Sequence, residues 1–311
     1  MLPEPLYSDQ LSVIMVLIVG LVGSAICVYA LGYMHDFQHH EPAGAPDRRH
    51  FFSALMFIFL SAMFVIVLSD NLEWLFTGWE ITTVCSFLMI GYTRTDEAIK
   101  NSFRQINLNM IGGLAFLAAS SCSTSAVSSS RSPRSSRRRA PPRPPCSSSR
   151  SCCFRLRASR GRADAVPQLA PRRMVAPTPT SALLHSSTMV KAGVFLLVKL
   201  APVYMVFPAA SIMVVTVGGV TFVLCSFMAI SQSNAKRVLA YSTIANLGLI
   251  AACAGVGIAE AAWAAVFLII FHTVSKSILF LCVGTVEHRI GSRNIETWTA
   301  SSAACRASPV S

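Results

Sequence analysis

Long stretches with almost no charge most constrain what this chain can fold into. Several of them run for about 18 residues or more, the length that a helix needs to cross the hydrocarbon core of a bilayer. Charged residues make up 13% of the chain, against about 25% in soluble domains, and the mean hydropathy is +0.55. The sequence therefore predicts an all-α, polytopic transmembrane helix bundle, a multi-pass protein in contact with the lipid bilayer.

The apolar runs predict seven spans, and one of these is long enough to form two helices. That last run divides near Gly255–Glu260, where glycine and an acidic residue interrupt it, so we expect eight helices. The runs cover residues 10–33, 50–69, 71–92, 103–120, 179–206, 208–231 and 238–286.

Basic residues mark alternate loops between these runs, whereas the other loops carry acidic residues or no charge. Basic loops tend to stay on the cytoplasmic side of a membrane. This pattern requires an odd number of crossings between residues 121 and 178. The basic residues are Arg48, Arg49, Arg94, Lys100, Arg104, Lys236, Arg237, Arg289 and Arg293.

Residues 121–173 conflict with that requirement. They contain 14 Ser, 13 Arg and 7 Pro against one acidic residue, Asp164, so this segment accounts for the whole formal net charge of +12. Its longest uncharged run, Ser121–Ser130, is too short and too polar to cross a bilayer, and the composition predicts disorder in water. Two interpretations are open: an Arg/Ser-rich insertion that binds nucleic acid or anionic lipid, or a stretch of gene read out of frame. The absence of Lys, Ile and Tyr favours the second.

Three ionisable residues in the spans before residue 200 are candidates for function, because a charge at bilayer depth costs at least about 2.5–3.5 kcal/mol. Glu80 lies about nine residues, or roughly 13 Å, into its expected helix and therefore near the midplane. The alternative for Glu80 is an interfacial acid beside Trp74 and Trp79. His185 and Lys191 fall in one later span, where the alternative for His185 is a histidine satisfied by neighbouring hydroxyl groups.

His272 and Lys276 are four residues apart, so they share one face of a helix. Two charges so close would repel each other, which couples their protonation and suits a proton relay. The alternative is a pair that faces a polar cavity without transport. With Glu80, His185 and Lys191, they make up the predicted proton pathway.

Metal and cofactor signals are weak. The histidines near the first loop, His35, His39, His40 and His50, are more typical of solvated side chains than of ligands. The cysteines outside residues 121–173 are scattered singly and are expected to behave as small apolar residues. We therefore expect no metal, no cofactor and no catalytic residue.

Three motifs are long and specific: LEWLFTGWEITTVCSFLMIGY at residues 72–92, VAPTPTSALLHSSTMVKAG at 175–193, and AKRVLAYST at 235–243. All three resemble the antiporter-like subunit of respiratory complex I. The same family includes the large subunit of Mrp-type cation/proton antiporters and membrane subunits of energy-converting hydrogenases. The resemblance implies a partial inverted-repeat antiporter-like fold, in which each complete repeat holds a broken helix with a functional lysine.

The resemblance also implies roles for the candidate residues. Glu80 matches the carboxylate of the first half-channel and would act on a lysine partner through its charge. His185 and Lys191 fall in the helix that closes the first repeat. His272 and Lys276 would connect the two half-channels along a hydrated axis, with the driving energy supplied by redox chemistry in a partner subunit.

The resemblance covers residues 1–120, as family helices three to six, and residues 174–297, as family helices eight to eleven. The first broken helix would fall inside residues 121–173, and the second lies beyond the end of the chain. After Glu296 the resemblance stops again. Codons for the family's Met-Asp-Gly, entered one nucleotide late, are compatible with Trp298-Thr299-Ala300. Residues 298–311 are therefore expected to be an out-of-frame tail.

The function implied is that of a proton-translocating membrane subunit of a NADH-quinone oxidoreductase-like or hydrogenase-like complex, located in the cell inner (plasma) membrane. Such a subunit works beside other membrane subunits, has no redox chemistry of its own, and would be inactive in this form without both broken helices. An Mrp-type cation/proton antiporter subunit is the alternative. A membrane-tethered Arg-rich binder of nucleic acid or anionic lipid is an alternative of another class. Because the segment offers only Phe154 for stacking on bases, no nucleic-acid partner is expected.

Overall fold

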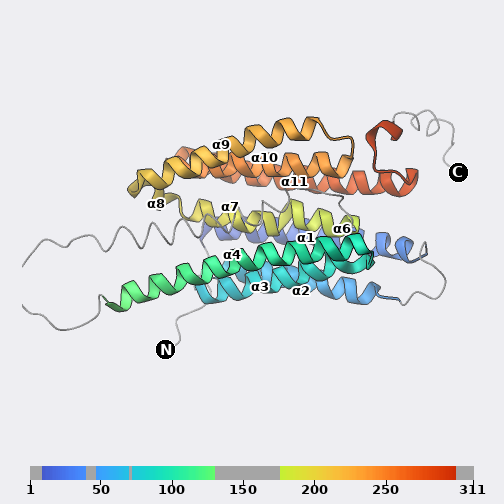
Figure 1. The fold of residues 1–311 in the computed structure, drawn as a ribbon, viewed down its shortest axis with the longest axis horizontal. Helices are drawn as coiled ribbons and strands as arrows, with labels where there is room; N and C mark the ends of the chain where they lie inside the picture. The colour runs from blue at the N-terminus through green and yellow to red at the C-terminus, as the bar shows by residue number, and fades with distance from the viewer. Residues whose placement is uncertain (1–8, 40–46, 70–71, 130–175, 299–311) are drawn as a thin grey trace, which may run out of the picture.

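The computed structural model describes residues 9–39, 47–69, 72–129 and 176–298, and within these ranges the protein is a bundle of helices in three layers (Figure 1). The middle layer holds α1 and the segment from α6 to α7. It lies between a layer of α2, α3 and α4 and a layer of α9, α10 and α11. The elements are α1 (Gln10–His39), α2 (Arg49–Leu68), α3 (Leu72–Ile90), η1 (Gly91–Thr93), α4 (Asp96–Ser129), α6 (Thr178–Ala182), η3 (Leu183–Ser187), α7 (Met189–Lys199), α8 (Ala201–Val206), α9 (Pro208–Ile230), α10 (Ala235–Gly255) and α11 (Ala259–Ile290).

The prediction of an all-α transmembrane bundle is confirmed. Among the described residues, seven helical segments are long and apolar enough to cross a membrane. α4, which contains the predicted span of residues 103–120, is not one of these seven. The last apolar run divides between Gly255 and Ala259, where the sequence predicted the break. Both resulting helices extend a few residues beyond the predicted run of 238–286, so Lys236 and Glu287 lie inside helices.

The predicted helix over residues 179–206 is wrong in one respect, because the structure breaks it. α6 passes into a π-helical turn, η3, and Thr188 then leaves helical geometry with φ −122° and ψ −96°. The hydroxyl of Ser186 donates to the carbonyl of Ala182, and that of Thr188 donates to the carbonyl of Leu183, both at 2.6 Å. Hydroxyl groups that donate hydrogen bonds to backbone carbonyls in this way favour π-turns and bends over a regular helix.

The ends of α1, α3, α9 and α11 meet the starts of α2, α4, α6 and α10 at one end of the bundle, on the right in Figure 1. The basic residues of the alternate loops belong to this end, which is called the basic end below. α4 ends at the opposite end of the bundle. The chain between Ser129 and Thr178 therefore joins opposite ends of the bundle, as the charge pattern required.

The segment 121–173 is described only in part. α4 continues to Ser129, nine residues into that segment. Residues 130–173 and residues 299–311 of the expected out-of-frame tail lie outside the described residues. The interpretation of both stretches therefore stays a prediction.

Side chains from all three layers form the core around the middle layer. One cluster of buried residues joins α1, α2 and α3 to η3 and α7, with Phe52, Phe59 and Trp79 among its largest members. A second cluster joins α7 to α10 and α11 through Phe195, Ile250 and Ile269. These two clusters fix the broken segment between the outer layers, and the candidate site lies there.

Candidate functional site

The break between η3 and α7 sets the position of Lys191. Thr188 accepts backbone hydrogen bonds from Lys191 at 2.9 Å and from Ala192 at 3.1 Å, so α7 restarts immediately after the break. Lys191 lies in the first turn of this new helix and is fully buried. A buried lysine at a helix break inside a membrane protein is typical of transporter sites.

Lys191 and His272 form the centre of the site. The Lys191 Nζ atom lies 2.5 Å from His272 Nδ1, across the contact between α7 and α11, and both side chains are buried. Two positive charges at this distance would repel each other strongly, so the two residues, called the central pair below, hold at most one charge between them. A proton shared between an amine and an imidazole can move by a small change in geometry.

Lys276 extends the site by one helical turn of α11. Its ammonium group donates a hydrogen bond to the hydroxyl of Ser242 on α10. His272 and Lys276 lie on one face of α11, as their spacing predicted, and both are buried. The central pair and Lys276 thus bring three basic side chains from two helices into the same interior.

His185 lies in η3, where its ring stacks on that of Phe280 with the centroids 5.7 Å apart. Its Nδ1 atom is buried and has no protein hydrogen-bond partner among the described residues, and the same holds for His272 Nε2. Buried polar atoms are almost always hydrogen-bonded to protein or to ordered water. Each ring therefore has a nitrogen without a protein partner, which an ordered water molecule would satisfy.

Glu80 stands on α3, in an outer layer of the bundle. It is half-buried and follows the buried Trp79 in the middle of the helix. The hydrogen bonds described above join Lys191 to His272 and Lys276 to Ser242 and do not run through Glu80. The role of Glu80 beside a lysine stays a prediction.

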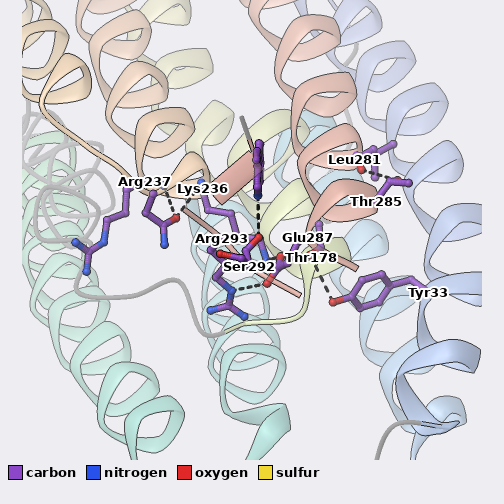
Figure 2. Close-up of polar contacts among 11 residues, drawn as sticks. Tyr33, Thr178, Lys236, Arg237, Leu281, Thr285, Glu287, Ser292 and Arg293 are labelled. Carbon is purple, nitrogen blue, oxygen red and sulfur yellow. Dashed lines mark hydrogen bonds and ion pairs between the residues drawn. The ribbon is translucent and has the colours of Figure 1, made fainter. Parts of the chain in front are cut away.

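The structure adds a polar cluster that includes Lys236 and Arg293, two residues that the sequence pattern placed in loops (Figure 2). Lys236 Nζ on α10 lies 2.5 Å from Glu287 Oε2 on α11 and donates to Thr178 Oγ1 at 2.9 Å. Arg293 contacts the other oxygen of Glu287. These four residues, Thr178, Lys236, Glu287 and Arg293, are called the basic-end cluster. The sequence does contain one signal for this cluster. Glu287 is an acidic residue directly after the predicted span of residues 238–286, and it precedes Arg289 and Arg293.

The protein resembles known membrane subunits over most of its length. The sequence model of the NADH:quinone oxidoreductase/Mrp antiporter transmembrane family matches residues 169–302, and that of the N-terminus of chain 5 of NADH-ubiquinone oxidoreductase (complex I) matches residues 3–45. NADH-quinone oxidoreductase subunit L of Rhodobacter capsulatus is 33% identical over 90% of this chain and 40% of its own length. Na(+)/H(+) antiporter subunit A1 of Staphylococcus aureus is 30% identical over 94% of this chain and 37% of its own length.

Solved structures agree with these relatives. A chain of the Mrp complex from Dietzia sp. superposes with a TM-score of 0.77 at 29% identity, covering 93% of this chain and 31% of that chain. A chain of the membrane-bound sulfane sulfur reductase, an archaeal respiratory membrane complex, has a TM-score of 0.68 at 20% identity, which shows a shared fold. The chain spans less than half the length of the curated relatives that it matches. With its buried lysines, its broken helix and these matches, the protein belongs to the family of antiporter-like membrane subunits that complex I shares with Mrp antiporters.

Proposed function

We propose that this chain is part of a proton-translocating membrane subunit of a NADH-quinone oxidoreductase-like or hydrogenase-like complex, and that it works beside other membrane subunits. The observation that carries the proposal is the 2.5 Å contact between Lys191 Nζ and His272 Nδ1 in the interior of the bundle. A pair that shares one charge can accept a proton on one side and release it on the other. The proton path in this proposal includes Lys191, His185, His272 and Lys276, with Glu80 acting on a lysine through its charge.

An Mrp-type cation/proton antiporter subunit is the second candidate. It is favoured by the likeness to the Dietzia Mrp complex and to the antiporter subunit of Staphylococcus aureus. The described part of the chain is compatible with both candidates, because the relatives of both kinds match nearly all of it. The two candidates differ in what drives the proton: electron transfer in a partner subunit, or the gradient of another cation.

Chimeras would test the function and separate the two candidates. Residues 174–297 would replace the matched span of subunit L in one complex and of antiporter subunit A1 in the other. We expect one chimera to support NADH-driven proton uptake or Na⁺-driven proton exchange in inverted membrane vesicles, with the activity lost in Lys191→Met and His272→Asn. Lys199→Met is the matched control, since Lys199 lies on the same helix outside the path.

The outcome can contradict the proposal clearly. If both chimeras assemble, as judged by native gel electrophoresis, and transport equally well with Lys191→Met and His272→Asn, then the central pair carries no proton. The 311-residue chain by itself spans less than half the length of its relatives and is expected to show no gradient-driven proton uptake in liposomes. Robust uptake by that chain would contradict the proposal that it is inactive alone.

A further inference from the structure

We propose that the basic-end cluster is the aqueous terminus of the proton path, where Glu287 and Lys236 exchange protons with water and pass them along α6 towards His185 and the central pair. This inference rests on the proposed function, because it names one end of the same path. Each step moves one proton from a donor atom to an acceptor atom, each of them oxygen or nitrogen. The cluster takes one proton from water for each one that it gives to the path, and no electron moves.

The exposure of the cluster changes in order from the interior to the surface. The side chain of Lys236 is 1% exposed, that of Glu287 is 15% exposed, and that of Arg293 is 39% exposed. The same carboxylate thus contacts a buried ammonium group through one oxygen and a partly exposed guanidinium group through the other. A carboxylate in this position can be reached by water while it remains bonded to the interior.

Thr178 connects this cluster to the broken segment. Its hydroxyl accepts from Lys236 Nζ at 2.9 Å and lies 3.4 Å from Glu287 Oε2 and 3.5 Å from the Tyr33 hydroxyl (Figure 2). Gly284 makes room for it, because a Cβ atom on that glycine would lie 2.3 Å from Thr178 Cγ2. The first residue of α6 is therefore held against the ion pair by its hydroxyl group.

Buried polar atoms mark a route from this cluster to the central pair. Along α11, Phe280 lies about 10 Å and His272 about 22 Å from Glu287, at 1.5 Å per residue. His185 stacks on Phe280, so it stands between the two ends of that route. Four buried atoms on the broken segment and α11 have no protein hydrogen-bond partner among the described residues: Thr180 Oγ1, His185 Nδ1, Ser187 Oγ and His272 Nε2.

Buried atoms without a protein partner call for ordered water. Buried waters make about three hydrogen bonds each to polar groups that would otherwise lack partners. A file of water along α6 and η3 would satisfy these atoms and conduct protons between the cluster and His185. A purely structural role does not explain why a buried ion pair is present here. Burying two charges often stabilises a fold no better than apolar residues of the same size do.

Exchange of the histidine C2 hydrogen in D₂O would test the terminus in the full chain, reconstituted in lipid nanodiscs. This slow exchange requires protonation of the ring and contact with water, and mass spectrometry of peptides reports it for each histidine. We expect measurable exchange at His185 and His272. Removal of the connecting hydroxyl in Thr178→Val should slow exchange at His185 by about fivefold, since one buried hydrogen bond is worth about 1 kcal/mol. Glu287→Gln should slow it as well.

Two controls keep the result specific. Thr285→Val makes the same change on the exposed face of α11, two residues from Glu287, and should leave the exchange of His185 unchanged. His50, an exposed residue at the start of α2, is the internal reference. Thr178→Val keeps the size and charge of the site. It therefore still tests the route if Glu287→Gln does not fold.

The outcomes separate this inference from the proposed function. If His185 and His272 exchange at the same rate in the parent chain, Thr178→Val and Glu287→Gln, water reaches the rings by another route, and only the terminus is wrong. If neither ring exchanges in the parent chain, the interior is dry, and both the terminus and the relay through the histidines are overturned.

Discussion

Lys236 and Glu287 form an ion pair at 2.5 Å that joins the start of α10 to the end of α11, with the lysine side chain almost fully buried. The pair closes the basic end of the helical hairpin, and Thr178 brings α6 to the same point. Its members come from positions 51 residues apart in the sequence, which only the hairpin of α10 and α11 brings together.

Lys236→Met should destabilise the protein far more than Lys199→Met. Removal of one partner of a fully buried ion pair costs about 3–5 kcal/mol. Glu287 keeps its contact with Arg293 in Lys236→Met, so the loss should lie near the lower end of that range. Lys199 pairs with Asp9 at 3.9 Å where both side chains are partly exposed, so its removal should cost about 1 kcal/mol or less. Equilibrium unfolding in mixed detergent would measure both free energies. Equal losses would mean that Arg293 alone compensates the charge of Glu287, and that the contact with Lys236 adds no stability.

Gly218→Ala should loosen the contact between α9 and α10. A Cβ atom there would lie 2.6 Å from the carbonyl oxygen of Gly248 and 2.7 Å from the backbone nitrogen of Ala252. Backbone atoms cannot turn aside as a side chain can, so the helices must separate, at a cost of about 1–3 kcal/mol.

The matched control is the neighbouring glycine. A Cβ atom on Gly219 meets nothing within 4 Å, so Gly219→Ala should be neutral or should stabilise the helix by about 0.5–1 kcal/mol. Thermal unfolding of both variants in detergent would compare them. Equal melting temperatures for the two variants would contradict the close packing of α9 on α10.

The start of α1 should weaken in acid through Asp9, which lies just before the membrane span. Burial of the Asp9 carboxyl acts to raise its pKa, but hydrogen bonds from Ser12 and the charge of Lys199 outweigh this and hold the pKa below the ordinary value of 3.8. A carboxyl with a lowered pKa in the folded state stabilises it fully above the ordinary value and loses that effect as the pH falls through the lowered one.

Asp9→Asn removes this titration. The unfolding free energy of the parent chain should therefore fall more steeply than that of Asp9→Asn as the pH decreases below 3.8. Unfolding curves collected at a series of acidic pH values would show the difference. Parallel curves would show that Asp9 has the same pKa in the folded and unfolded chains.

Resequencing of the gene across codons 118–176 and 294–300 should find a missing or additional base in each stretch. The restored frame is expected to supply a further membrane span between residues 121 and 173 and to extend the chain beyond Glu296. Confirmation of the present frame would contradict the out-of-frame interpretation and would favour an Arg-rich insertion. Binding of such an insertion to nucleic acid should weaken steeply as the salt concentration rises.

The sequence by itself determined the class of the fold and the identity of the candidate residues. Charge-free runs of bilayer length predicted the helices, since unpaired backbone groups cannot be tolerated in lipid. The spacing of His272 and Lys276 placed them on one helical face, and motifs such as the one around Glu80 pointed to the family. These inferences depend on local composition and on short periodic spacing, which a single sequence contains.

Only the tertiary structure decided which of these residues meet. Lys191 and His272 are 81 residues apart, and their contact depends on how α7 packs against α11 after the break at Thr188. That break arises because side-chain hydroxyl groups donate hydrogen bonds to backbone carbonyls that a regular helix would pair with its own N–H groups. A hydropathy pattern does not reveal such hydrogen bonds. Lys236 looked like a loop residue on the basic side of the membrane. Its burial depends on Glu287 and Thr178, two partners that reach it only when three helices pack together.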